Sequence, residues 1–262
     1  HRSGVIPESG KINELKDWPR NVHEARRFIL GCIPESEALE GLPERDIYGR
    51  GDEPAKLEEA ELVEGSELVA IHVADPRHPD LRSSFSGFLD GTQDVRKVSH
   101  HHGIPIVWAT VSAAVRKRVN RRLVAWPLRM PIVRGSYYIP FRYVDGLSVD
   151  LRSHSRSIDT TARPNGQGVF PSRHPAALTE AAVKAIQADR EAIETELAED
   201  WCAVETDPLY VDGGTCGSAV AAESPLAIGV VKSHHRLYAD ERGFRILVNL
   251  RPGERTSVFR VT

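Results

Sequence analysis

The sequence predicts an α/β protein with a mixed sheet, flanking helices and a helical arm at its N-terminus. Two observations predict this class. Several short segments rich in β-branched and aromatic residues lie between residues 66 and 144. One long segment of helical periodicity, 175–201, then separates them from further apolar segments. Strands followed by a helix and more strands are the order expected of an α/β domain.

The first 80 residues are predicted to form a helical and acidic arm, and residues 81–262 a separate main domain. We expect a helix over 11–31, an exposed acidic helix over 54–65 and a strand over 66–75. The first of these helices is indicated by apolar residues at helical spacing, which are Trp18, Val22, Ala25 and Ile29.

The main domain is predicted to begin with strands and to continue through a long helix. The expected strands lie at 85–91, 104–115, 121–128, 134–144, 208–214 and 243–250, with an apolar segment at 224–238. Residues 152–174 are rich in Ser, Arg, Gly and Pro and are expected to form a loop. Pro175 suits the first turn of the helix over 175–201, whose apolar stripe comprises Val183, Ile186, Ile193 and Leu197.

The net charge of −3 hides a strong polarity along the chain. The segment 35–67 holds twelve acidic residues, whereas 96–144 holds ten Lys or Arg residues and no acid. The basic block is either a DNA-binding surface, with stacking by nearby Trp108, Trp126, Tyr137 and Tyr138, or the solvated face of a hairpin. The residues predicted to contact DNA are Arg116, Lys117, Arg118, Arg121 and Arg122.

The three cysteines, Cys32, Cys202 and Cys216, are widely spaced and form no disulfide or CxxC pattern, which favours a reducing, cytoplasmic location. The clean apolar run near the C-terminus, "LAIGVV", is too short to span a bilayer, and no signal-peptide pattern opens the chain. We therefore expect no association with a membrane.

The segment "FSGFLDG", residues 85–91, leads into Asp90, for which three roles compete. Asp-Gly is a common turn dipeptide. A phosphatase-type nucleophile would require an Asp two positions earlier, where this chain has Phe88. The third role is a metal ligand, and it depends on partner residues.

Asp212 repeats the pattern of Asp90, because "LYVDGG" is a second apolar strand that ends in Asp-Gly. Two such strands that are neighbours in one sheet would bring both carboxylates to one cation. The helix before Asp212 offers Glu194, with Glu191 as the alternative. Oxygen ligands of this kind suit Mn²⁺ or Mg²⁺ and the two-metal hydrolysis of phosphodiesters.

The order of "FLDGT", "REAIETELAED", "LYVDGG" and "AIGVVKSHH" resembles the NurA family of DNA-end-processing nucleases. The resemblance covers roughly residues 85–262 and implies an RNase H-like fold. It implies that Asp90, Glu194 and Asp212 hold Mn²⁺ (or Mg²⁺) and that Lys232 assists at the scissile phosphate. The family has one more polar ligand near the C-terminus, which lies past Thr262 or is supplied by His234 or His235.

The resemblance also implies a homodimer that encloses DNA and a HerA-like hexameric ATPase as partner, in DNA end resection or anti-phage defence. The leading hypothesis is thus a two-metal-ion deoxyribonuclease acting on DNA ends and single strands. The alternative is a non-catalytic DNA-clamp or adaptor subunit of a translocase complex, which would keep the fold and the basic surface but lack the metal chemistry.

Overall fold

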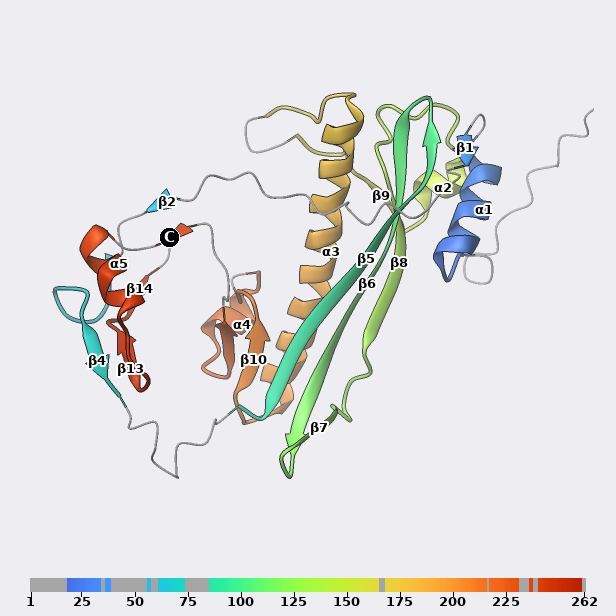
Figure 1. The fold of residues 1–262 in the computed structure, drawn as a ribbon. Helices are drawn as coiled ribbons and strands as arrows, with labels where there is room; N and C mark the ends of the chain where they lie inside the picture. Colours follow the sequence, from blue (N-terminus) through green and yellow to red (C-terminus); the bar gives the residue numbers. More distant parts are fainter. Residues whose placement is uncertain are drawn as a thin grey trace, which may run out of the picture.

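The chain folds around one mixed sheet with helices packed against it. The computed structural model describes residues 18–33, 36–38, 56–57, 61–73, 85–164, 168–215, 217–230, 236–237 and 240–260. Within them, an eight-stranded sheet forms the centre of the structure (Figure 1). This confirms the α/β class and the mixed sheet with flanking helices that the sequence predicts.

The central sheet follows the strand order β11-β10-β5-β6-β8-β9. Its strands are β5 (Gly87–His101), β6 (Ile104–Val119), β8 (Ile132–Ile139), β9 (Ser157–Asp159), β10 (Leu209–Asp212) and β11 (Ala227–Val230), and β1 (Ser36–Ala38) and β7 (Arg122–Ala125) pair with β5 and β6. β5, β6 and β8 are antiparallel, whereas β10 runs parallel to β5 and β11 parallel to β10. The long helix α3 (Pro175–Val204) connects β9 to β10, which pairs parallel to β5, and β9 likewise runs parallel to β8.

Two tight turns set the register of the long β5–β6 hairpin and of β7 against β6. His102 and Gly103 have φ angles of 48° and 78°, and Asn120 and Arg121 have 50° and 64°. Two consecutive residues with positive φ are typical of the two-residue turns whose twist matches that of paired strands.

Each face of the sheet has its own apolar core. Helix α3 covers one face, with Ile193, Leu197 and Trp201 packed against Leu89 and the alternate residues of β6. On the other face, α1 (Val22–Cys32) packs near the β5–β6 turn, in a cluster that includes Ile29, Val98 and Trp108. No helix among the described residues has the length and apolar character needed to cross a membrane.

The helices confirm the sequence analysis in part. The helix predicted over 175–201 is α3, which His174 caps and Pro175 opens. The helix predicted over 11–31 begins only at Val22 within the described residues, because the Asn21 side chain accepts hydrogen bonds from the amides of His23 and Glu24 and caps it there. The predicted loop 152–174 contains the end of α2 (Val149–Ser153) and β9.

A second group of strands joins two distant parts of the sequence (Figure 1). Its members are β2 (Lys56–Leu57), β3 (Glu61–Leu62), β4 (Ala70–His72), β12 (Arg236–Leu237), β13 (Glu254–Thr256) and β14 (Phe259–Arg260), with helix α5 (Glu241–Val248) between β12 and β13. β2 pairs with β12, β3 with β14 and β4 with β13. These pairs connect residues on both sides of position 80, where we expected the arm to end.

Two predicted elements in this group are wrong. The described part of 54–65 forms β2 and β3 and not an acidic helix, because strands from the far end of the chain pair with it. The strand predicted over 243–250 is mostly helix α5. The Asp240 side chain accepts a hydrogen bond from the Gly243 amide, and Glu241 pairs with Arg245 one turn later, so local capping and charge pairing favour the helix.

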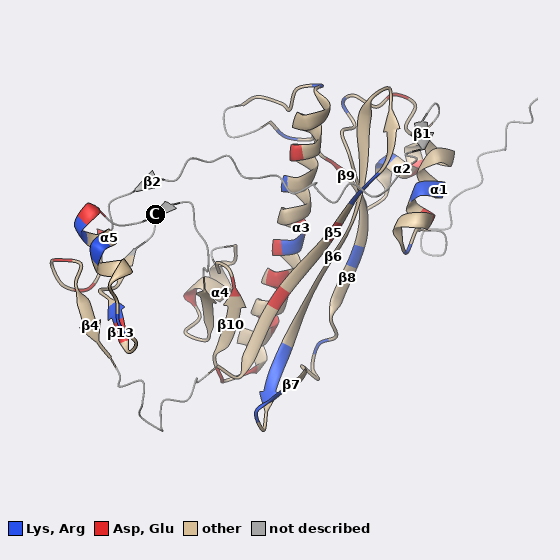
Figure 2. Ribbon diagram, viewed as in Figure 1, with Lys and Arg blue, Asp and Glu red and all other residues tan. Residues whose placement is uncertain are grey.

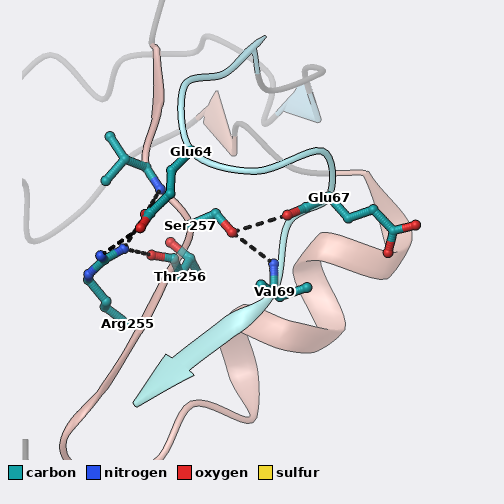
Figure 3. Close-up of polar contacts among 7 residues, drawn as sticks. Glu64, Glu67, Val69, Arg255, Thr256 and Ser257 are labelled. Carbon is teal, nitrogen blue, oxygen red and sulfur yellow. Dashed lines mark hydrogen bonds and ion pairs between the residues drawn. The ribbon is translucent and has the colours of Figure 1, made fainter. Parts of the chain in front are cut away.

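An ion pair between Glu64 and Arg255 connects the N-terminal and the C-terminal segments of this group (Figure 3). Arg255 donates to both carboxylate oxygens of Glu64, at 2.6 and 3.0 Å, and Glu64 also accepts from the Val258 amide. Ser257, which is 2% exposed, donates to the Glu67 carbonyl and accepts from the Val69 amide. The hydrogen bonds from Arg255 and then from Val258 lower the pKa of Glu64 to about 2.

This pKa predicts an acid-sensitive connection. Because the folded-state pKa of Glu64 is depressed, its contribution to stability is present above the ordinary pKa of 4.5 and is lost as the pH falls toward 2. We expect Arg255→Ala to move the Glu64 pKa up toward 4.5 and to speed amide hydrogen exchange over 61–73, both measured by NMR. Arg242→Ala, which removes the exposed pair with Glu67, is the control and should change neither. An unchanged Glu64 pKa in Arg255→Ala would contradict this role.

Candidate active site

Asp90 and Asp212 lie side by side on neighbouring strands. β10 runs parallel to β5 in a register that pairs Tyr210 with Phe88 and Val211 with Leu89. The next residue on each strand is Asp212 and Asp90, and neighbouring strands are about 4.8 Å apart. The expectation that the two Asp-bearing strands are neighbours in one sheet is therefore confirmed.

The position of Asp90 within its strand differs from the expectation. Asp212 ends β10, but Asp90 is the fourth residue of the 15-residue strand β5. Asp90 and Gly91 pair with Ala114 and Ala113 in a continuous ladder. The interpretation of this Asp-Gly as a turn is wrong, because the pairing of a long hairpin overrides the local preference of the dipeptide.

Glu194 of α3 reaches the sheet at Gly91. A Cβ added to Gly91 would lie 1.9 Å from Glu194 Oε1 and 2.8 Å from its Cδ. The carboxyl group of Glu194 therefore occupies the space that a side chain at position 91 would fill. The Glu194 side chain is only 13% exposed, so the group is held between helix and sheet.

The three acids lie near Gly91 in sequence or in space, but not on a single face of the sheet. Side chains alternate along a strand. Leu89 is buried in the core beneath α3 and Gly91 faces Glu194, so Asp90, between them, projects from the opposite face, where it is exposed. The missing side chain at position 91 is what lets the acid of α3 reach β5 beside Asp90's strand position.

The pKa of Glu194 reports this proximity. Burial is the largest cause that raises it, and the neighbouring carboxylates of Glu191, Asp90 and Asp212 raise it further. Arg190 opposes these effects, with its Nη1 3.7 Å from Glu194 Oε1. The charges of Asp90 and Asp212 thus both contribute to the raised pKa of Glu194, although less than burial does.

A pocket of about 270 Å³ opens between α3 and the segment that follows β10. Glu191, Glu194 and Asp212 line it, together with Arg190. Another part of its wall is Ser218, which caps α4 (Ala219–Glu223) and donates a hydrogen bond to Glu199. Glu191, the alternative helix acid, lines the same pocket, but the contact with Gly91 belongs to Glu194.

The donor chemistry of the trio fits a divalent cation. Carboxylate oxygens are what Mn²⁺ and Mg²⁺ prefer, and the mutual repulsion felt by Glu194 is what a cation would relieve. The present arrangement is not yet a coordination site: in the part of the chain that the structure describes, no three His, Cys, Asp or Glu residues form a group that could hold a metal ion. Lys232, His234 and His235, the other predicted site residues, lie outside the described residues.

The predicted DNA-contacting residues lie on the β6–β7 hairpin at one end of the sheet (Figure 2). Arg116, Arg121 and Arg122 are exposed, and Arg118 is partly exposed. Lys117 differs from them, because both Glu205 carboxylate oxygens bind its ammonium group, at 2.7 and 2.8 Å.

The aromatic residues near the basic block cannot stack on nucleic-acid bases, so that expectation is wrong. They are buried in the two cores, with exposed fractions of 1% for Trp108, 2% for Trp126 and 0% for Tyr137 and Tyr138. Trp126 also donates a hydrogen bond to Glu205, the carboxylate that holds Lys117.

Sequence analysis missed Gly91 and Arg190 as parts of the site. For Arg190 the signal was its spacing of four residues from Glu194 in a helix, which places the two on one face. For Gly91 the signal was a glycine inside a strand, which often marks the close approach of another group.

We expect Gly91→Ala to displace the Glu194 carboxyl group without unfolding the protein, because the clashing atoms are the far end of a flexible side chain. The displacement should lower the pKa of Glu194 toward its ordinary range, as measured by NMR titration of side-chain carboxyl carbons, with Glu194→Gln used for assignment. Gly214→Ala is the control, since an added Cβ there meets nothing within 4 Å. An unshifted Glu194 titration in Gly91→Ala would show that the two residues are not in contact.

Comparisons with known protein families, with curated proteins and with solved structures give no match to this chain. The functional conclusion therefore depends on the residues of the site. Glu194 of α3 lies against Gly91 and lines a pocket with Asp212, while Asp90 and Asp212 lie on neighbouring strands of the sheet that also carries the basic hairpin.

Proposed function

We propose that this protein is a metal-dependent nuclease in which Asp90, Glu194 and Asp212 bind Mn²⁺ or Mg²⁺. The observation that carries the proposal is the carboxyl group of Glu194, which lies against Gly91 and whose pKa is raised mainly by burial and further by neighbouring carboxylates, Asp90 and Asp212 among them. Carboxylates whose charges raise the pKa of a largely buried neighbour are relieved when a proton or a cation neutralises them.

The order of the elements supports an RNase H-like fold. The resemblance to NurA nucleases implies a first strand with an Asp, a helix with a Glu and a second strand with an Asp. In this chain β5 carries Asp90, α3 carries Glu194, and β10 with Asp212 returns beside β5 and parallel to it. The order of these three elements along the chain, and the pairing of β10 with β5, match the order that the resemblance implies.

A bound divalent ion would supply the activation of a water molecule and the stabilisation of the leaving oxygen during phosphodiester hydrolysis. The protein's own residues have a different task. In the proposed site, Asp90 and Asp212 would supply carboxylates from neighbouring strands, and Glu194 would supply a third carboxylate from α3. The raised pKa of Glu194 makes protons compete with the cation, so cation binding should strengthen as the pH rises.

The basic hairpin supports DNA as the substrate. Arg116, Arg118, Arg121 and Arg122 lie on the hairpin at one end of the strand pair that carries Asp90, and charges of this kind contact phosphates without regard to sequence. We leave Lys117 out of this set, because Glu205 binds it. From the resemblance we further propose a homodimer and a HerA-like ATPase as partners in DNA end processing.

One observation favours the alternative function, a DNA-clamp or adaptor subunit of a translocase complex without catalysis. The described residues contain no group of acids already arranged to hold a metal ion. A protein of that kind would use the basic hairpin and leave Asp90 and Asp212 without a chemical role.

Nuclease activity on linear DNA with Mn²⁺ decides between the two functions, assayed with and without the partner ATPase. We expect the wild type to degrade DNA, and Asp90→Asn, Glu194→Gln and Asp212→Asn to be slower by at least about a hundredfold, because a lost ligand removes several kcal/mol of transition-state stabilisation. Asp94→Asn is the matched control, since Asp94 lies on the same face of β5 but pairs with Arg96.

Two results would count against the nuclease. If Asp90→Asn cleaves as fast as the wild type, the metal assignment is wrong. If the wild type binds DNA but cleaves it under none of these conditions, the adaptor function is the correct one.

DNA binding itself should depend on salt and on the hairpin arginines. We expect the Arg121→Ala/Arg122→Ala double variant to weaken binding equally for all sequences. It should reduce the slope of log affinity against log salt by about 0.7 per lost phosphate contact on single strands. Arg245→Ala is the control, because this exposed arginine of α5 belongs to the second strand group and pairs with Glu241. Fluorescence anisotropy over a salt series measures both, and an unchanged slope in the double variant would remove these arginines from the interface.

A further inference from the structure

The two Asp-Gly strands share more than their acids. β5 reads "FLDG" over residues 88–91 and β10 reads "YVDG" over residues 210–213. The second residue of each pattern, Leu89 in β5 and Val211 in β10, is buried in the core beneath α3. The aromatic residue before it must therefore project from the other face of the sheet, the face on which Asp90 is exposed.

Phe88 and Tyr210 form an aromatic pair on that face. They are direct neighbours across the two strands, and their ring centroids lie 5.9 Å apart. Phe85 packs edge-on against Tyr210 at 5.5 Å. All three rings are only partly buried, and α1, which packs on this face, lies at the β5–β6 turn end of the hairpin.

The pair is placed next to both an acid and a cation. Phe88 and Asp90 are two residues apart on one side of the same strand, which is a separation of about 7 Å. In the opposite direction, the Arg118 guanidinium lies over the Phe88 ring, 5.8 Å from its centroid. Arg116 is the cross-strand partner of Phe88 on β6 and is exposed. Basic, aromatic and acidic side chains therefore follow one another along β5 and β6.

We propose that Phe88 and Tyr210 are a stacking platform for the bases of single-stranded DNA, next to the acids of the site. This inference rests on the proposed nuclease function, because it assigns the residues that position the strand for it. Accessible rings combined with arginines are the usual means of binding a single strand without sequence preference, and the rings of Phe88 and Tyr210 are partly accessible. Arg116 and Arg118 supply the phosphate contacts, and Asp90 comes next along the strand.

Single-stranded DNA is the occupant that this chemistry fits, because stacking on a ring requires a base face that a duplex keeps covered. An apolar protein partner would not need guanidinium groups around the rings. The flanking cations and the acid two residues away thus favour an anionic, base-bearing ligand that a divalent ion can neutralise at one end.

Binding of a fluorescein-labelled twelve-residue oligothymidylate to the whole protein, in metal-free buffer with a chelator, tests the platform without cleavage. We expect Phe88→Leu and Tyr210→Leu each to weaken binding about fivefold to a hundredfold, the range that loss of one stacked base predicts. Tyr210→Phe keeps the ring and should bind within twofold of the wild type. The matched control Phe244→Leu removes a ring of α5 that is 41% exposed and should also leave binding unchanged.

A single strand that contains 2-aminopurine gives a second, independent measurement. Stacking of 2-aminopurine on a ring changes the fluorescence of the base. Binding to the wild type should therefore change this fluorescence, and binding to Phe88→Leu should not. Circular dichroism and thermal melting establish that each variant is folded. The platform is refuted if the wild type does not bind the single strand, or if both leucine variants bind it within twofold of the wild type.

The platform and the nuclease can fail separately. If Asp90→Asn abolishes Mn²⁺-dependent cleavage while the leucine variants bind normally, the nuclease stands and the platform is wrong. If the leucine variants lose binding but the wild type never cleaves, the platform stands and the protein is a binding subunit.

Discussion

The parallel pairing of β10 with β5 is the constraint on which the site depends. It brings a residue from the end of the long crossover, Asp212, beside one from the first long strand of the sheet. The register is anchored from the core side, because Leu209 and Val211 are 0% and 5% exposed beneath α3. Burial of each such side chain stabilises the fold by about 1.5–3 kcal/mol. If the register of β10 slipped by one residue, Leu209 and Val211 would turn to the opposite face of the sheet. Asp212 and the Tyr210 ring would then change faces as well.

The second constraint is the close approach of α3 to β5, which glycines allow. A Cβ at Gly87 would lie 2.6 Å from the Trp201 ring, and one at Gly91 would lie 1.9 Å from the Glu194 carboxyl group. The two glycines are four residues apart on β5 and face the same helix. One makes room for the largest apolar side chain of the helix, and the other for its acid. The packing that stabilises the fold therefore also positions Glu194.

Much of the framework could be predicted from the sequence, for physical reasons that differ between elements. Helix α3 has a first-turn proline and an apolar stripe, and strand β6 has a long β-branched run, so local patterns were sufficient. Helix α5 was mistaken for a strand because "GFRILVNL" is short and apolar. The residues that determine the helix, the Asp240 cap and the Glu241–Arg245 pair, begin two to three residues before that segment.

The site was predictable only as far as local sequence encodes it. The similarity of "FLDG" and "YVDG" correctly indicated neighbouring strands, since in both the side chains alternate between the core face and the opposite face of the sheet. The contact between Gly91 and Glu194 could not be predicted from this similarity. Asp-Gly favours turns locally, and only the pairing of β5 with β6 keeps Asp90-Gly91 extended. The pairing of 56–73 with 236–260 lay beyond any local pattern, because its partners are separated by most of the chain.

The acids impose a cost that the rest of the fold must offset. Glu194 is largely buried, and its burial and the charges of Glu191, Asp90 and Asp212 raise its pKa, whereas Arg190 lowers it. Within the same helix, Ile186, Ile193, Leu197 and Trp201 are each at most 1% exposed, which contributes several kcal/mol of apolar burial on both sides of Glu194. A carboxyl group can be kept in an unfavourable place when the element that carries it is held by such a core. The fold therefore tolerates the raised pKa of Glu194 because the helix that carries it is fixed by this core, and under the proposed function a bound cation would lower that cost.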